Sequence, residues 1–270
     1  MRFMQLVLLS LAALAASTAR AQFDHTHGAW NQLLGRHVAV LDGGAASKVR
    51  YAGFKEDRAG LKAYLDSLSA VEPAQFDGWS KAERLAFLIN AYNAFTVELV
   101  VRNYPGIKSI RDLGSIFVSP WRKRFFTLLG AERHLDDIEH GMIRKPGVYD
   151  DPRIHFAVNC ASVGCPMLRE EAYVASRLDA QLEDQTVRFL SDRSRNRYDP
   201  RRGVLEVSRI FDWYRKDFSS GLRGIETPQE FLAMYARLLA DPAPHRQAIS
   251  SGEVPIRYLE YDWGLNDAGS

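Results

Sequence analysis

The segment 80–104 constrains the fold more than any other part of this sequence. Its apolar residues recur at helical spacing, and its opposite side is apolar as well, which predicts a helix buried on nearly all sides. Ser80 and Glu83 fit a capping box at its start, and Pro105-Gly106 is a stop signal at its end. Other elements must therefore pack around this helix on every side.

Two amides interrupt the apolar surface of the predicted helix. Asn90 and Asn93 lie three residues apart, with Tyr92 between them. A buried amide without a hydrogen-bond partner costs about 1–3 kcal/mol. We therefore expect Asn90, Tyr92 and Asn93 to join a polar network that holds a crossing loop, or to contact a ligand, and both interpretations remain open.

The stretch 153–166 holds both cysteines of the chain and a candidate polar site. Apolar residues alternate there with His155, Ala157 and Asn159, which predicts a short strand with one apolar face. In a helix, His155 and Asn159 would still share a face, because four residues make about one turn. Either structure predicts a polar site around His155, Asn159 and Cys160.

Periodicity and breaker residues predict the remaining elements. Together they predict an α+β protein, predominantly helical with a small sheet, in a single compact domain over residues 22–270. Glu139 stands at the capping-box position of one of the short helices. The predicted helices cover 58–70, 136–144 and 176–192 and begin again after Ser208 and Thr227, and the extended pieces cover 51–54, 125–129, 204–207 and 256–263.

The first 21 residues have the pattern of a secretory signal peptide. Arg2 is followed by an apolar run from Leu6 to Ala16 and by the cleavage signal Ala19-Arg20-Ala21. We expect cleavage after Ala21 and a periplasmic or secreted protein. No later segment is apolar enough for a bilayer, so no transmembrane segment is expected in the mature chain.

Charge argues against nucleic acid as a partner. Removal of residues 1–21 takes away Arg2 and Arg20 and no acid, so Lys+Arg falls from 35 to 33 and equals Asp+Glu at 33. The mature net charge is then zero, and no broad basic field remains. The expected partner is an unknown small molecule or protein.

Export makes a disulfide between Cys160 and Cys165 permissible, and we expect one. It would close a small loop and stabilise the fold by only about 2 kcal/mol. A redox-active pair is the weaker interpretation, because C-x4-C is not the C-x2-C spacing of thioredoxin-like oxidoreductases.

The residue types also permit a thiol-centred enzyme. Cys160 would be the nucleophile, with His155 or His140 as its base and Asn159 or Glu139 orienting the imidazole. Papain-like and transglutaminase-like enzymes use such a set, although the analogy is one of residue types only. A metal hydrolase using these histidines with His134 is disfavoured by the lack of an H-E-x-x-H spacing, and no metal or cofactor is predicted.

Several segments of the chain resemble the domain of unknown function 547 family. The resemblance implies a single, mostly helical domain in exported bacterial proteins, and it carries no established activity. The segments are Phe87–Ala94, Leu135–His140, Asp151–Ala157, Asn159–Ser162 with Cys165-Pro166, and Tyr261–Trp263 with Leu265-Asn266.

The sequence therefore favours a binding or scaffold domain with a local disulfide, in which the asparagines and His155 form a satisfied polar network. The alternative is a thiol-dependent hydrolase or transferase. Whether the protein is an enzyme stays open at this level.

Overall fold

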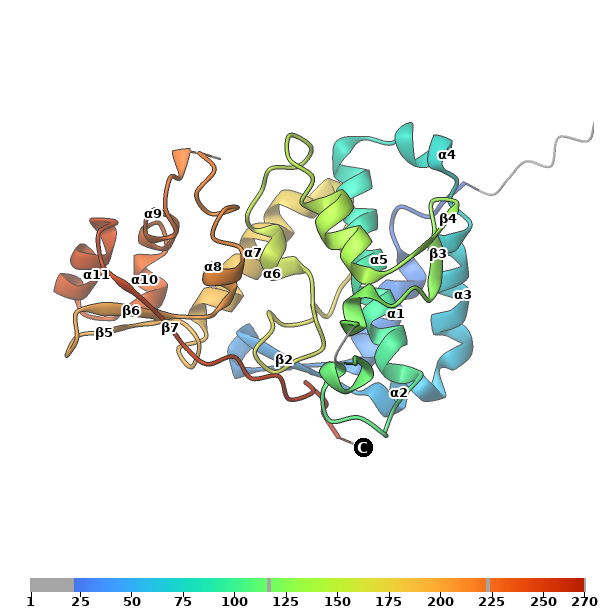
Figure 1. Ribbon diagram of the computed structural model, residues 1–270, viewed down its shortest axis with the longest axis horizontal. Coiled ribbons are helices and arrows are strands. Elements are labelled where there is room, and N and C mark those ends of the chain that lie inside the picture. The colour runs from blue at the N-terminus through green and yellow to red at the C-terminus, as the bar shows by residue number, and fades with distance from the viewer. Residues whose placement is uncertain (1–21, 116–117, 222–223, 270) are drawn as a thin grey trace, which may run out of the picture.

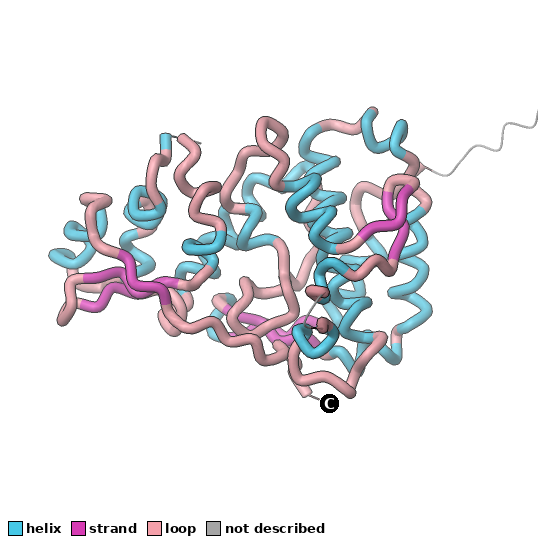
Figure 2. The backbone as a smooth tube through the Cα atoms, viewed as in Figure 1, coloured by secondary structure: helices cyan, strands magenta, loops and turns pink. Residues whose placement is uncertain are grey.

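The computed structural model describes residues 22–115, 118–221 and 224–269, so the predicted signal peptide lies outside the described residues. Helices dominate, and the strands form small sheets at the periphery (Figure 2). The predicted α+β, predominantly helical class is confirmed. Two hydrophobic cores lie side by side along the long axis of the molecule (Figure 1).

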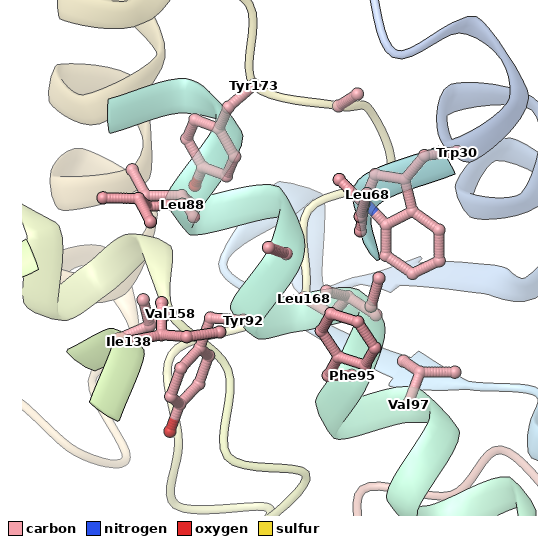
Figure 3. Close-up of a cluster of buried hydrophobic side chains, with 14 of the residues drawn as sticks. Trp30, Leu68, Leu88, Tyr92, Phe95, Val97, Ile138, Val158, Leu168 and Tyr173 are labelled. Carbon is pink, nitrogen blue, oxygen red and sulfur yellow. The ribbon is translucent and has the colours of Figure 1, made fainter. Parts of the chain in front are cut away.

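The first core surrounds α5 (Lys81–Val101), the helix predicted from the segment 80–104. Its capping box is confirmed, since Ser80 Oγ accepts from the Glu83 amide and the Glu83 carboxylate accepts from the Ser80 amide. Figure 3 shows side chains projecting from α5 into the surrounding elements. The elements that pack in this core include α1 (Gly28–His37), α2 (Tyr51–Glu56), α3 (Arg58–Ser69), α4 (Pro73–Asp77) and the antiparallel hairpins β1–β2 (Val38–Leu41, Ala46–Val49) and β3–β4 (Phe126–Leu128, Ala131–Arg133).

Length and composition alone would let α5 cross a membrane. However, 94% of its apolar window is buried inside the protein, as expected for the central helix of a core. It is the one helix of this kind in the described part of the chain.

The second core lies between later helices and a small mixed sheet. In this sheet β5 (Arg197–Asp199) pairs antiparallel with β6 (Val204–Val207), and β6 pairs parallel with β7 (Ile256–Tyr258). The parallel pairing requires a long crossover, which the intervening helices supply. The helices of this core are α7 (Leu178–Ser191), α8 (Ile210–Trp213), α9 (Pro228–Ala233), α10 (Ala236–Leu239) and α11 (Ala243–Ser250).

The C-terminal segment ties the two cores together. After β7 the chain runs back along the lower edge of the molecule toward β2 (Figure 1). Leu265 pairs with Ser162, and Asp267 pairs with Val49. This return brings the segment 261–263 beside the central stretch.

The prediction of a strand in the central stretch is wrong: residues Ile154–Ala157 form the short helix α6. Ile154 and Ala157 pack in the first core, whereas Phe156 packs in the second. The apolar alternation thus reflects burial between two cores, not the pleat of a sheet. The segment 51–54 is also helical (α2) rather than extended, and the final strand is shorter than predicted.

Candidate active site

A sharp turn presents Cys160 at the junction of the two cores. Ala161, which follows it, has φ 61°, a left-handed conformation that is uncommon for a residue with a side chain. Asn159 holds this turn, because its Oδ1 accepts from the Ala161 amide at 2.9 Å and its Nδ2 donates to the Pro166 carbonyl at 2.7 Å. Asn159 therefore shapes the loop that carries Cys160.

The two amides of α5 also bind backbone. Asn93 Nδ2 donates to the Ala157 carbonyl at 2.9 Å, and its Oδ1 accepts from the Asn159 amide at 2.8 Å. Asn90 makes the same pair of bonds with the backbone of Tyr173, at 2.7 and 3.0 Å. The asparagines thus fix crossing segments on α5, and the structure does not bring them to His155 as hydrogen-bond partners.

Asn93→Ala is expected to lower the free energy of unfolding by about 2–4 kcal/mol, because it leaves a buried carbonyl and a buried N–H without partners. Urea unfolding measures the change. Asn103→Ala is the matched control, since the Asn103 side chain, just beyond the end of α5, donates to the nearby Leu99 carbonyl and bridges no distant segment. Equal, small losses in both variants would contradict a bridging role for Asn93.

The two cysteines are free thiols in the structure, and the predicted disulfide is not formed. Cys165 Sγ accepts a hydrogen bond from the Cys160 amide at 2.8 Å. Cys160 Sγ instead lies 3.1 Å from Ser162 Oγ and 3.1 Å from the Tyr261 hydroxyl.

The two thiols differ in acidity. Burial alone would raise the pKa of Cys160, but hydrogen bonds from Cys165, Ser162 and Tyr261 outweigh it and lower that pKa. Burial raises the pKa of Cys165 well above its ordinary value, and the neighbouring Cys160 raises it further. Of the pair, Cys160 is the thiol whose surroundings favour the thiolate.

His155 forms a buried pair with Asp217. Its Nε2 donates to Asp217 Oδ2 at 2.7 Å, and its ring stacks on Tyr214 with centroids 3.8 Å apart. Nδ1 is buried and has no hydrogen-bond partner among the described residues. Burial lowers the pKa of His155 despite the opposing effect of Asp217, so the ring is neutral and Nδ1 carries a lone pair at neutral pH.

Asp217 has a second partner in Arg144, whose Nε and Nη2 lie 2.6 and 3.0 Å from the carboxylate. Burial would raise the pKa of Asp217, but the hydrogen bonds from His155 and Arg144 bring it below its ordinary value. The carboxylate therefore stays ionised while it orients the imidazole. No motif or spacing in the sequence indicated Asp217.

Glu139 and His140 lie on η4 (Asp137–Ile143), a π-helical segment. The predicted capping role of Glu139 is wrong, because the segment has no side-chain cap. The Glu139 carboxylate instead accepts from the Tyr214 hydroxyl at 2.5 Å. The exposed His140 has its Nδ1 2.7 Å from Arg144 Nη1.

One cavity of about 210 Å³ gathers these groups. Cys160, His155, His140 and Glu139, the four residues considered for catalysis, all line it. Tyr92, which projects from α5 beside Val158 (Figure 3), lines it as well, whereas Asn90, Asn93 and Asn159 do not. The rest of the lining includes five aromatic residues, Trp121, Trp213, Tyr214, Tyr261 and Trp263.

The site has no cluster typical of a metal centre. Within residues 22–115, 118–221 and 224–269, no group of three or more His, Cys, Asp or Glu side chains could hold a metal ion. His134, considered as a ligand, instead has its Nδ1 3.0 Å from the Asp137 amide. The ionisable side chains that line the cavity include thiols, imidazoles and carboxylates.

Comparisons with known proteins give one family-model match. No curated protein and no solved structure matches the chain. Residues 76–190 match the family model described as "Protein of unknown function, DUF547". The match includes Glu139, His155 and Cys160, whereas Asp217 and Tyr261 lie beyond it. The chain therefore has a DUF547 domain match over residues 76–190.

Proposed function

We propose that this protein is a thiol-dependent acyl-transfer enzyme, a hydrolase or transferase. Cys160 is its nucleophile, and His155, oriented by Asp217, is the base. The observation that carries the proposal is that a free thiol and a histidine with a buried carboxylate partner line the same cavity. A nucleophile, a base and a group that orients the base are the parts that such catalysis requires.

The surroundings of Cys160 support its role as the nucleophile. The thiolate is the reactive form of cysteine, and Ser162 and Tyr261 are placed to donate hydrogen bonds to it. The left-handed turn at Ala161 adds to this, because backbone strain of this kind concentrates at functional sites.

The tautomer of His155 supports its role as the base. Because a carboxylate only accepts hydrogen bonds, the Nε2–H of His155 is committed to Asp217. The lone pair is then on Nδ1, which is the atom without a partner. An imidazole in this state can take the proton of a thiol and later return it to a leaving group.

The reaction balances with these groups. His155 takes the thiol proton, and Cys160 Sγ forms a bond to the carbonyl carbon of the acyl substrate. The bond between this carbon and the leaving group of the substrate then breaks as His155 protonates the leaving group. Water or an amine then attacks the thioester, gives its proton to His155 and releases the thiol. If water accepts the acyl group, the enzyme is a hydrolase. If an amine accepts it, the enzyme is a transferase.

A scaffold role explains less of the site. It accounts for Asn90, Asn93 and Asn159, whose bonds to backbone fix the fold. It gives no role to the cavity or to the unpartnered Nδ1 of His155, although buried polar atoms are normally paired. We also propose export, on the signal-peptide pattern of residues 1–21, so assays need reduced protein.

Alkylation tests the nucleophile directly. With limiting iodoacetamide, Cys160 in the reduced, folded protein is expected to react at least about tenfold faster than Cys165, because only its surroundings favour the thiolate. Peptide mapping by mass spectrometry gives both rates, and urea-unfolded protein, in which the thiols should react alike, is the control. Equal rates in the folded protein, or faster reaction at Cys165, would contradict the proposal.

A further inference from the structure

We propose that the cavity beside Cys160 binds a substrate through an organic cation, an ammonium or guanidinium group, held by Glu139 and the aromatic wall. The inference rests on the proposed function, because it takes this cavity as the substrate site. Its evidence is independent of the thiol chemistry: a buried carboxylate with no Lys or Arg nitrogen of the described residues within 4.0 Å.

The buried glutamates of the described chain other than Glu139 form ion pairs with arginines. Among the described residues, Glu98, Glu139 and Glu206 are buried. Glu98 is paired with Arg58 and Arg102. Glu206 is paired with three arginines, namely Arg197, Arg202 and Arg257. Such pairing is expected, since a buried charge is costly unless it is compensated.

Glu139 departs from this rule. It is only 4% exposed, yet no Lys or Arg nitrogen of the described residues lies within 4.0 Å of its carboxylate. Its ion-pair neighbour in the described chain is the exposed imidazole of His140, with Nδ1 3.9 Å away, and its hydrogen-bond donor is the hydroxyl of Tyr214. Arg144 is engaged with Asp217 instead. The missing cation fits a group that enters the cavity from outside.

A second carboxylate adds to the negative field of the cavity. Asp136 also lines it, and its ion-pair neighbour within 4.0 Å in the described chain is again the imidazole of His140, whose Nε2 lies 3.9 Å from Oδ1. No Lys or Arg is among the described residues that line this cavity. A ligand there therefore meets two acids, and a cation is the complementary charge.

The aromatic wall supplies the rest of a cation site. Trp263 contacts Tyr261 at 4.5 Å and Trp213 at 5.6 Å between ring centroids. The faces of such rings attract cations. The chain itself uses two rings of this wall in that way, with Arg111 over Trp263 at 5.2 Å and Arg144 over Tyr214 at 4.7 Å.

Benzylamine, charged at pH 7, and its neutral isostere benzyl alcohol are the probes that test the inference. Tryptophan fluorescence of the reduced full chain reports binding, because three tryptophans line the cavity. Benzylammonium is expected to bind at least about tenfold more tightly than benzyl alcohol. Glu139→Gln keeps the shape and can still accept from Tyr214, and it should remove most of this preference. Glu132→Gln, which changes an exposed acid on β4, should keep it.

Stability separates this role from a structural one. Glu139→Gln is expected to leave the melting temperature unchanged or raised, whereas Glu98→Gln lowers it because two arginines lose their partner. Equal binding of both probes to the wild type, an unchanged preference in Glu139→Gln, or destabilisation by Glu139→Gln would each overturn the inference. Binding does not need the thiol. If the wild type shows no preference for benzylammonium but has normal Cys160 chemistry, only the cation site is refuted. The preference together with an inert Cys160 refutes only the proposed function.

Discussion

Cys160→Ser is expected to slow the hydrolysis of 4-nitrophenyl acetate by the reduced protein by about 10³-fold or more. The serine hydroxyl is far less acidic than a thiol and is a poor nucleophile without strong activation. The hydrogen bonds to Ser162 and Tyr261, which favour a thiolate, do little for a neutral hydroxyl. The release of 4-nitrophenolate, followed by absorbance, gives the rate.

Cys165→Ser is the matched control, because it removes the other thiol of the same loop. A serine there can still accept from the Cys160 amide, as Cys165 Sγ does, so the turn should persist. We expect this variant to keep its rate within about tenfold of the wild type. Loss of activity in Cys165→Ser alone, or similar rates in all three proteins, would contradict the assignment of Cys160.

His155→Ala is expected to lower kcat by about 10²–10⁴-fold, the range for loss of a general base. Asp217→Asn should lower kcat by about 10²-fold with little change in KM, because Asn no longer enforces the tautomer that leaves Nδ1 free. Steady-state kinetics on folded protein measures both effects. A structural defect that leaves less active protein would also lower the apparent kcat at unchanged KM, so both rates are referred to the concentration of folded protein.

Asp212→Asn controls for the loss of a carboxylate in the same region. Asp212 forms an ion pair with Arg209 at the surface and does not line the cavity, so its replacement should leave kcat unchanged. If Asp217→Asn and Asp212→Asn behave alike, or if His155→Ala retains full activity, His155 is not the base.

The sequence predicted the parts of the fold that depend on local signals. The capping box and the all-round apolar pattern sufficed for α5, because both act within a few residues of the chain. The alternation in the central stretch predicts a strand, but the burial of its residues arises from two cores that meet only in the folded chain. An alternating pattern cannot distinguish a pleated strand from a short helix buried on all sides.

The site residues likewise differ in whether local sequence signals could predict them. Cys160 and His155 were evident from the sequence, since both lie in one short stretch. Asp217 was not, because it follows α8 and reaches His155 only through the packing of the second core. The sequence could not predict the environment of Glu139, because its position fits a capping box that the folded segment does not form.

The most direct test of Cys160 as the nucleophile is to identify which residue carries the acyl group after the reaction is quenched with acid. Reduced protein is mixed with 4-nitrophenyl acetate, quenched within the first turnover and digested, and the acetylated peptide is identified by mass spectrometry. We predict one acetyl group on Cys160 as a thioester, removed by hydroxylamine and absent in Cys160→Ser. Turnover without an acetyl group on Cys160, or an acetyl group found only on Cys165 or on lysines, would contradict the account.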